Sequence, residues 1–95
     1  MKLSPRNQIE VPHMMPTEIG MVDTLYEICD AEFNSRADVH HSFAACKGAK
    51  SWTRYYLLHE VRKVAARESI MCSYHMAFVI ATKISEIWFE QKEAR

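Results

Sequence analysis

The second half of the chain, residues 49–95, contains neither glycine nor proline. These two residues disfavour a helix interior most, by about 1 and 3 kcal/mol relative to alanine. All three prolines lie within residues 1–16, and the two glycines, Gly20 and Gly48, also precede the second half. Because so long a stretch lacks helix-breaking residues, the sequence predicts an all-α fold.

The prolines also separate an arm from a domain. Pro5, Pro12 and Pro16 interrupt a polar segment without helical periodicity, which predicts an extended N-terminal arm over residues 1–16. Residues 17–95 are then expected to form a single helical domain, because a chain of 95 residues is of the size of one hydrophobic core.

The spacing of apolar residues predicts two helices before Gly48. The first begins with Thr17 as N-cap and ends near Asn34. Its buried face carries Val22, Leu25, Tyr26, Cys29 and Phe33. A short second helix is predicted from the segment 35–38, which has the pattern of a capping box with Asp in place of Glu. Its expected buried face carries Val39, Phe43 and Cys46, and Gly48 is its expected C-terminal cap.

A third helix is predicted over residues 52–67, with Ser51 as N-cap. Its apolar face carries Leu57, Leu58, Val61, Val64 and Ala65. On one continuous helical wheel the apolar stripe then swings by roughly 140° near residues 66–69. A break there, with Ser69 capping the next helix, lets both stripes face one core. The alternative is one helix of about 60 Å, which suits only an oligomer.

The fourth helix has an apolar arc broader than the ~100° that a surface helix needs. Its main stripe carries Ile70, Tyr74, Ala77, Phe78, Ala81, Ile84 and Trp88. Either this helix lies at the centre of the bundle or part of the arc is an interface. We expect a homodimer, with an interface formed by Met76, Ile80, Ile84, Ile87 and Trp88.

Charge is unevenly distributed, although the twelve basic and twelve acidic residues cancel. Residues 17–48 hold six acidic side chains against two basic ones, and residues 49–68 hold five basic against two acidic ones. One interpretation is that the acidic helix packs beside the basic one. The other is that the third helix presents a binding surface to a partner.

We define the aromatic-basic face as the expected partner-binding surface of this third helix. It consists of Trp52, Arg54, Tyr55, Tyr56, His59, Arg62, Lys63 and Arg67. Rings of this kind anchor in partner pockets or stack on bases, and Arg and Lys reach carboxylates or phosphates. The alternative for Trp52 and one tyrosine is ordinary core packing.

A degenerate helix–turn–helix is the nearest approach to a DNA-binding pattern, over residues 39–59. Ala44 and Gly48 have the spacing of its small residue and turn glycine. Ser51, Thr53 and Arg54 would open the recognition helix, with Leu58 facing inward. Lys47 and Tyr55 depart from the pattern, because the first position is normally apolar and the second is large for a tight helix crossing.

Some residues have the types and spacing of zinc ligands, but the pattern does not predict a zinc site. Cys72 and His75 are spaced i, i+3 on one helix face, and His40, His41 and Cys46 could contribute from another segment. No paired Cys-x2-Cys knuckle is present, and His41 and Cys46 do not share a helix face. We therefore expect no metal.

The remaining expectations concern chemistry and location. No phosphate loop, nucleophile elbow or His-Glu-x-x-His motif is present, so we expect no catalytic residues and no cofactor. Three cysteines are an odd number, which favours reduced thiols in a cytoplasmic protein. The most apolar stretch, residues 76–89, is interrupted by Lys83 and Glu86 and is shorter than a membrane span.

Together these observations predict an all-α bundle of three to four helices with an extended N-terminal arm. The expected function is that of a non-enzymatic regulator, an inhibitor or adaptor, that binds a protein through the aromatic-basic face. The alternative is a nucleic-acid-binding regulator that uses the same helix.

Overall fold

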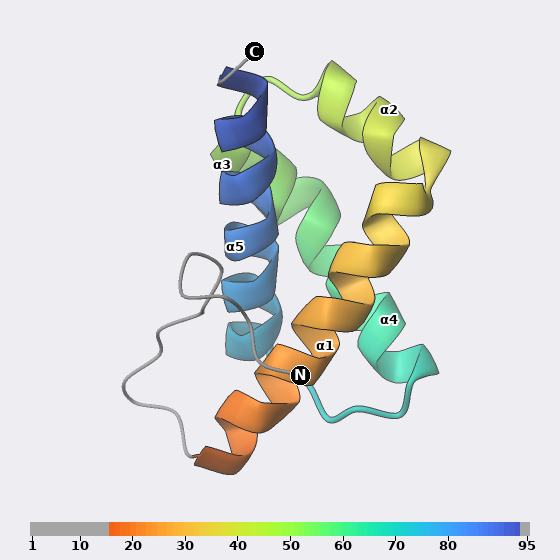
Figure 1. Cartoon of the computed structure of the whole chain (residues 1–95), viewed down its shortest axis with the longest axis vertical. Helices are drawn as coiled ribbons and strands as arrows, with labels where there is room; N and C mark the ends of the chain where they lie inside the picture. Colours follow the sequence, from red (N-terminus) through yellow and green to blue (C-terminus); the bar gives the residue numbers. More distant parts are fainter. Residues whose placement is uncertain (1–15, 94–95) are drawn as a thin grey trace.

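The computed structural model describes residues 16–93, with side chains from residue 19 onward (Figure 1). The predicted arm, residues 1–16, therefore lies almost wholly outside the described residues. The helical elements are α1 (Pro16–Ser35), α2 (Ala37–Ala45), α3 (Ala49–Trp52), the π-helical turn η1 (Thr53–Leu57), α4 (Leu58–Arg67) and α5 (Tyr74–Glu93). Because α3, η1 and α4 follow one another without a break, residues 16–93 form four helical units and no strand. The predicted all-α bundle is confirmed.

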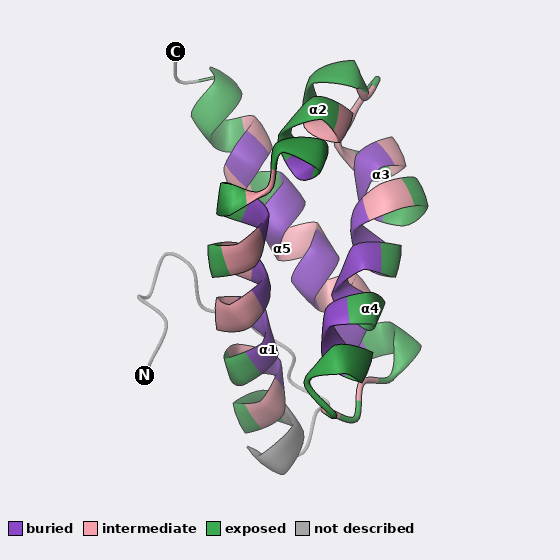
Figure 2. Cartoon of the chain, turned by 90° about the vertical axis from the view of Figure 1, so that its right-hand side faces the viewer, coloured by how far each residue is buried: buried purple, intermediate pink, exposed green. Residues whose placement is uncertain are grey.

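Helix α5 is the central element of the bundle. It contacts α1, α3, η1 and α4. Figure 1 shows α5 running opposite to the continuous α3–α4 helix, with α2 across the end where α5 finishes. In Figure 2 the buried sides of α1, α4 and α5 face one another, and the exposed sides face outward. This arrangement gives α5 neighbours on several sides, as its broad apolar arc requires.

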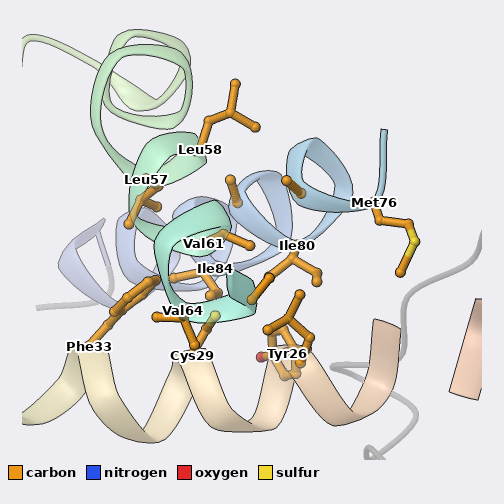
Figure 3. Packing of buried hydrophobic residues seen from close by; sticks show 14 of the residues in the cluster. Tyr26, Cys29, Phe33, Leu57, Leu58, Val61, Val64, Met76, Ile80 and Ile84 are labelled. Atoms are coloured by element: carbon orange, nitrogen blue, oxygen red, sulfur yellow. The ribbon is translucent and has the colours of Figure 1, made fainter. Parts of the chain in front are cut away.

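The core contains the apolar stripes that the sequence predicts for the first and third helices. All five expected residues of α1 and all five expected residues of the third helix are buried. Figure 3 shows Tyr26, Cys29 and Phe33 pointing from α1 toward Val64 and Ile84. Helical periodicity alone was therefore sufficient to identify these two faces.

The predicted break after the third helix is confirmed, because α4 ends at Arg67 and α5 begins at Tyr74. The turn is a Schellman motif. The Ile70 amide donates to the Ala65 carbonyl at 2.9 Å, and the Ser69 amide donates to the Ala66 carbonyl at 3.2 Å. Ser69 has φ of 56°, in the left-handed region that this position requires.

Ser69 does not cap the next helix, so that prediction is wrong. The cap of α5 is Ser73, whose Oγ accepts a hydrogen bond from the Met76 amide at 3.1 Å. The spacing from Ser73 to Met76 is that of an N-cap and the third helical residue. The fourth helix therefore starts one turn later than its apolar residues indicate.

Three predicted caps around α2 are also wrong. Ser35 lies in the last turn of α1 and donates from Oγ to the Glu32 carbonyl at 2.9 Å. Helix α2 instead begins after Arg36, which makes no side-chain capping bond. It ends at Ala45, and its C-cap is Cys46 in extended conformation, so Gly48 is not the C-cap. Gly48 precedes α3, which begins before Ser51.

Four of the five residues expected at a dimer interface are buried within a single chain: Met76, Ile80, Ile84 and Trp88. The fifth, Ile87, is half-buried against the same core. Their burial accounts for the broad apolar arc of α5 without a second copy. Homodimerisation itself stays a prediction, which the sedimentation mass would test.

None of the helices in the range 16–93 combines the length and the apolar character that crossing a membrane demands.

Candidate binding groove

Trp52 belongs to the core and not to an exposed face. Only 2% of its surface is exposed, and its Nε1–H donates a hydrogen bond to Ser42 Oγ of α2 at 2.9 Å. Its ring lies 4.9 Å from that of Phe43 and 5.1 Å from that of Trp88, between centroids. The aromatic-basic face therefore loses its first member, in agreement with the core-packing alternative.

Three further members of the face contact other side chains of the bundle. Tyr56 is half-buried and stacks on Trp52, with ring centroids 6.5 Å apart. Lys63 forms an ion pair with Glu60 at 3.1 Å, and Arg67 forms one with Glu32 of α1 at 2.7 Å. Of these two ion pairs, only Arg67–Glu32 joins the basic helix to the acidic one, because Lys63 and Glu60 both belong to α4.

Arg36 connects this ion-pair network across three elements. Its guanidinium contacts Glu32 at 3.1 Å, Asp38 at 2.6 Å and Glu60 at 2.7 Å. The hydrogen bonds from Arg36 lower the pKa of Asp38 to about 2. Burial raises the pKa of Glu60, but hydrogen bonds from Arg36 and Lys63 outweigh burial and lower it overall. The network therefore links α1, α2 and α4 through ion pairs in which Asp38 and Glu60 are ionised.

The other half of the face borders a groove between η1–α4 and α5. Arg54, Tyr55 and His59 line one wall, and Tyr74 and His75 line the other. The groove has a volume of about 640 Å³, and its floor is formed by Leu58 and Phe78. Leu58 points away from the α1 side of the core (Figure 3).

Two tyrosines from different helices stand exposed at this groove. Tyr55 is 78% exposed and Tyr74 is 59% exposed, although both are large rings. Burying such a ring is strongly favourable, so an exposed pair beside an apolar floor marks a surface suited to a partner.

The groove continues along α3 toward the other end of α5. A second hollow of about 300 Å³ is lined by residues that include Lys50, Thr82 and Glu86, and it shares Arg54 and Phe78 with the first. The two hollows therefore adjoin at Arg54 and Phe78, and we call them together the α4–α5 groove. Thr82 Oγ1 is buried there without a hydrogen-bond partner among the described residues.

The α3–α4 wall of this groove is basic. Lys50 and Arg54 line this wall and are exposed. Neither of them forms an ion pair with another described residue, and neither does the exposed Arg62 of α4. Arg62 lies one turn beyond His59 on α4 and lines neither hollow. On the opposite wall the acidic residue is Glu86. The basic members of the aromatic-basic face thus divide into Lys63 and Arg67, which are paired, and Arg54 and Arg62, which are not.

The sequence did not indicate the α5 side of the groove. The sequence places Tyr74 and Phe78 in the apolar stripe of the fourth helix, and it places His75 beside Cys72 at the spacing of zinc ligands. The π-helical turn η1, which carries Arg54 and Tyr55, was also not foreseen. Such turns occur often at functional sites, but they leave no reliable signal in a single sequence.

The helix–turn–helix alternative, residues 39–59, corresponds to most of α2, the link 46–48, α3, η1 and the start of α4. Of the three residues expected to open a recognition helix, Thr53 is buried, Ser51 is half-buried and Arg54 is exposed. Leu58 is buried, as that pattern requires. The arrangement therefore leaves Arg54 to reach a base, together with the neighbouring exposed Lys47 and Lys50.

Among residues 19–93, no group of three or more His, Cys, Asp or Glu side chains is arranged to hold a metal ion. Comparison with protein-family models, curated proteins and solved structures gives no match to this chain.

Proposed function

We propose that this chain is a non-enzymatic regulator, an inhibitor or adaptor, that binds a protein partner through the α4–α5 groove. The observation that carries the proposal is the exposure of Tyr55 and Tyr74 on opposite walls above the apolar floor. Tyrosine and arginine are the residues enriched where binding energy concentrates in protein interfaces. Arg54 lies beside Tyr55 in the same groove.

Site-specific crosslinking in the producing cell tests this proposal. A photoreactive phenylalanine derivative is placed at position 55 or 74, and at position 63 as a control. Lys63 is exposed on the same helix but lies outside the groove, paired with Glu60. We expect a discrete protein adduct from positions 55 and 74 and none from position 63. Adducts from position 63 alone would show that the groove is not the binding surface.

Truncating the anchors should then weaken the captured complex. Tyr55→Ala and Tyr74→Ala are each expected to reduce affinity about tenfold or more, the range of buried aromatic anchors. Both residues are exposed in the free chain, so the thermal midpoint of the free protein should stay nearly unchanged.

Nucleic-acid binding is the second candidate. It is favoured by Lys47 in the link, Lys50 in α3 and Arg54 in η1, which are exposed and form no ion pair with another described residue. Phosphate contacts would make duplex binding weaken steeply as salt is raised, and Arg54→Ala would reduce both the affinity and that salt dependence. Failure to bind any duplex at low salt would eliminate this candidate.

A further inference from the structure

We infer that the segment bound in the α4–α5 groove is an acidic amphipathic helix, an inference that rests on the proposed function. Its apolar side chains would lie on the Leu58–Phe78 floor between Tyr55 and Tyr74. Its carboxylates would face the α3–α4 wall, where Lys50 and Arg54 are exposed.

The shape of the groove favours a helix as its occupant. The two hollows share Arg54 and Phe78, so the groove follows α3–α4 from Lys50 to His59. At 1.5 Å per residue this distance is about 14 Å, which two to three turns of a partner helix would fill. A peptide that bound as an added strand would need an exposed sheet edge, and the described residues form no strand.

The charges of the two walls determine the chemistry of that helix. Lys50 and Arg54 line one side without an acidic partner among the described residues. These cations can pair with carboxylates of a partner without first breaking an ion pair of their own. Glu86 on the other wall, near Lys50, disfavours an acidic residue at that point. A row of acids along one flank of the partner helix fits this arrangement.

Selection from a library of random peptides of about 16 residues, long enough for four helical turns, tests the inference on the full chain. The selected peptides are expected to carry acidic residues on one flank and apolar residues at i, i+4 spacing. Their affinity should fall about tenfold for Arg54→Ala and for Tyr55→Ala, and it should fall as salt is raised. Lys63→Ala is the matched control, since it removes a charge from the same helix outside the groove, and it should leave the affinity unchanged.

The remaining outcomes separate this inference from the proposed function. Peptides that lose affinity in Tyr55→Ala but have no acidic bias would overturn the inference and support the proposed function. If no peptide is selected, the inference is overturned. If instead a labelled duplex of about 20 base pairs binds and Lys50→Ala weakens it, the proposed function is overturned as well.

Discussion

Arg36 donates a hydrogen bond from Nη2 to Oε1 of Glu60, at 2.7 Å, and so joins the α1–α2 link to α4. The Glu60 side chain is only 10% exposed, and its other oxygen accepts a hydrogen bond from Lys63 at 3.1 Å. A carboxylate with so little access to water must replace its hydration with protein donors. Arg36 therefore contributes to stability mainly by making the burial of Glu60 tolerable.

Replacing Arg36 with alanine should destabilise the fold more than is usual for a residue between two helices. Glu60 would keep only Lys63 as a partner, and the contacts to Glu32 and Asp38 would also be lost. We expect the free energy of unfolding to fall by roughly 2–3 kcal/mol, somewhat less than for a fully buried pair. Urea denaturation at neutral pH measures this loss.

Arg67→Ala is the matched control for this experiment. Arg67 also pairs with Glu32, at 2.7 Å, but its side chain is more than half exposed. An exposed pair of this kind contributes less than about 1 kcal/mol. Equal losses for the two variants would contradict the role assigned to Glu60, and so would a failure of Glu60→Gln to offset part of the Arg36→Ala loss.

Acid should weaken the same network through Asp38. Hydrogen bonds from Arg36 lower the pKa of Asp38 in the folded chain to about 2, from an ordinary value of 3.8. A lowered pKa means that ionised Asp38 stabilises the fold above about pH 4, and that this contribution is lost as the pH falls toward 2. Asp38→Asn should therefore flatten the fall in stability between pH 4 and pH 2.

Urea midpoints at several pH values between 2 and 5 provide the measurement. Glu93→Gln is a suitable control, because Glu93 is exposed at the end of α5 outside the network. Its profile should follow that of the unmodified chain. If the Asp38→Asn profile also follows that of the unmodified chain, the contact between Arg36 and Asp38 does not persist in solution.

The core and its helices could be predicted from the sequence because they depend on local periodicity. The stripe around Val61 and the break after Arg67 follow from helical periodicity, to which every residue of the segment contributes. The caps were less predictable. Ser35, Ser51, Ser69 and Ser73 are all compatible with an N-cap, and only the packed structure selects Ser73.

Only one wall of the candidate groove could be predicted from the sequence, because the burial of an aromatic ring depends on neighbours that are distant in the sequence. Trp52 and Tyr55 are three residues apart, yet Trp52 is buried through Ser42 and Trp88 while Tyr55 is exposed. Those contacts come from α2 and α5. Tyr74 was missed for the converse reason, since an aromatic residue in an apolar stripe is usually part of the core.

Ser69→Gly should stabilise the chain. The left-handed conformation at Ser69, with φ of 56°, costs an L-residue roughly 1–2 kcal/mol, a cost that glycine avoids. Glycine also loses more backbone entropy on folding, which offsets part of the gain. We expect the free energy of unfolding to rise by about 0.5–1 kcal/mol in urea denaturation. Ser69→Ala, which retains a Cβ, should give no such gain, and equal effects of the two substitutions would contradict the explanation.

The three cysteines should differ sharply in reactivity. Cys29 is fully buried in the core, and burial, with a further contribution from Glu32, raises the pKa of its thiol to about 12. Cys46 and Cys72 are half-buried. The thiolate is the reactive form, and at pH 8 a thiol with that pKa is ionised in only about one molecule in ten thousand. Cys29 should therefore react with a thiol reagent only when the chain opens.

Thiol labelling of the native protein at pH 8 should show two accessible groups and one slow group. The slow rate should rise with urea, because it reports the population of opened molecules. Cys29→Ala should remove the slow phase and leave the faster labelling of Cys46 and Cys72 intact. In Arg36→Ala the same slow phase should accelerate, since the weaker network makes opening more frequent. Labelling of all three thiols at one rate would show that the packing of α1 against α4 and α5 is not maintained in solution.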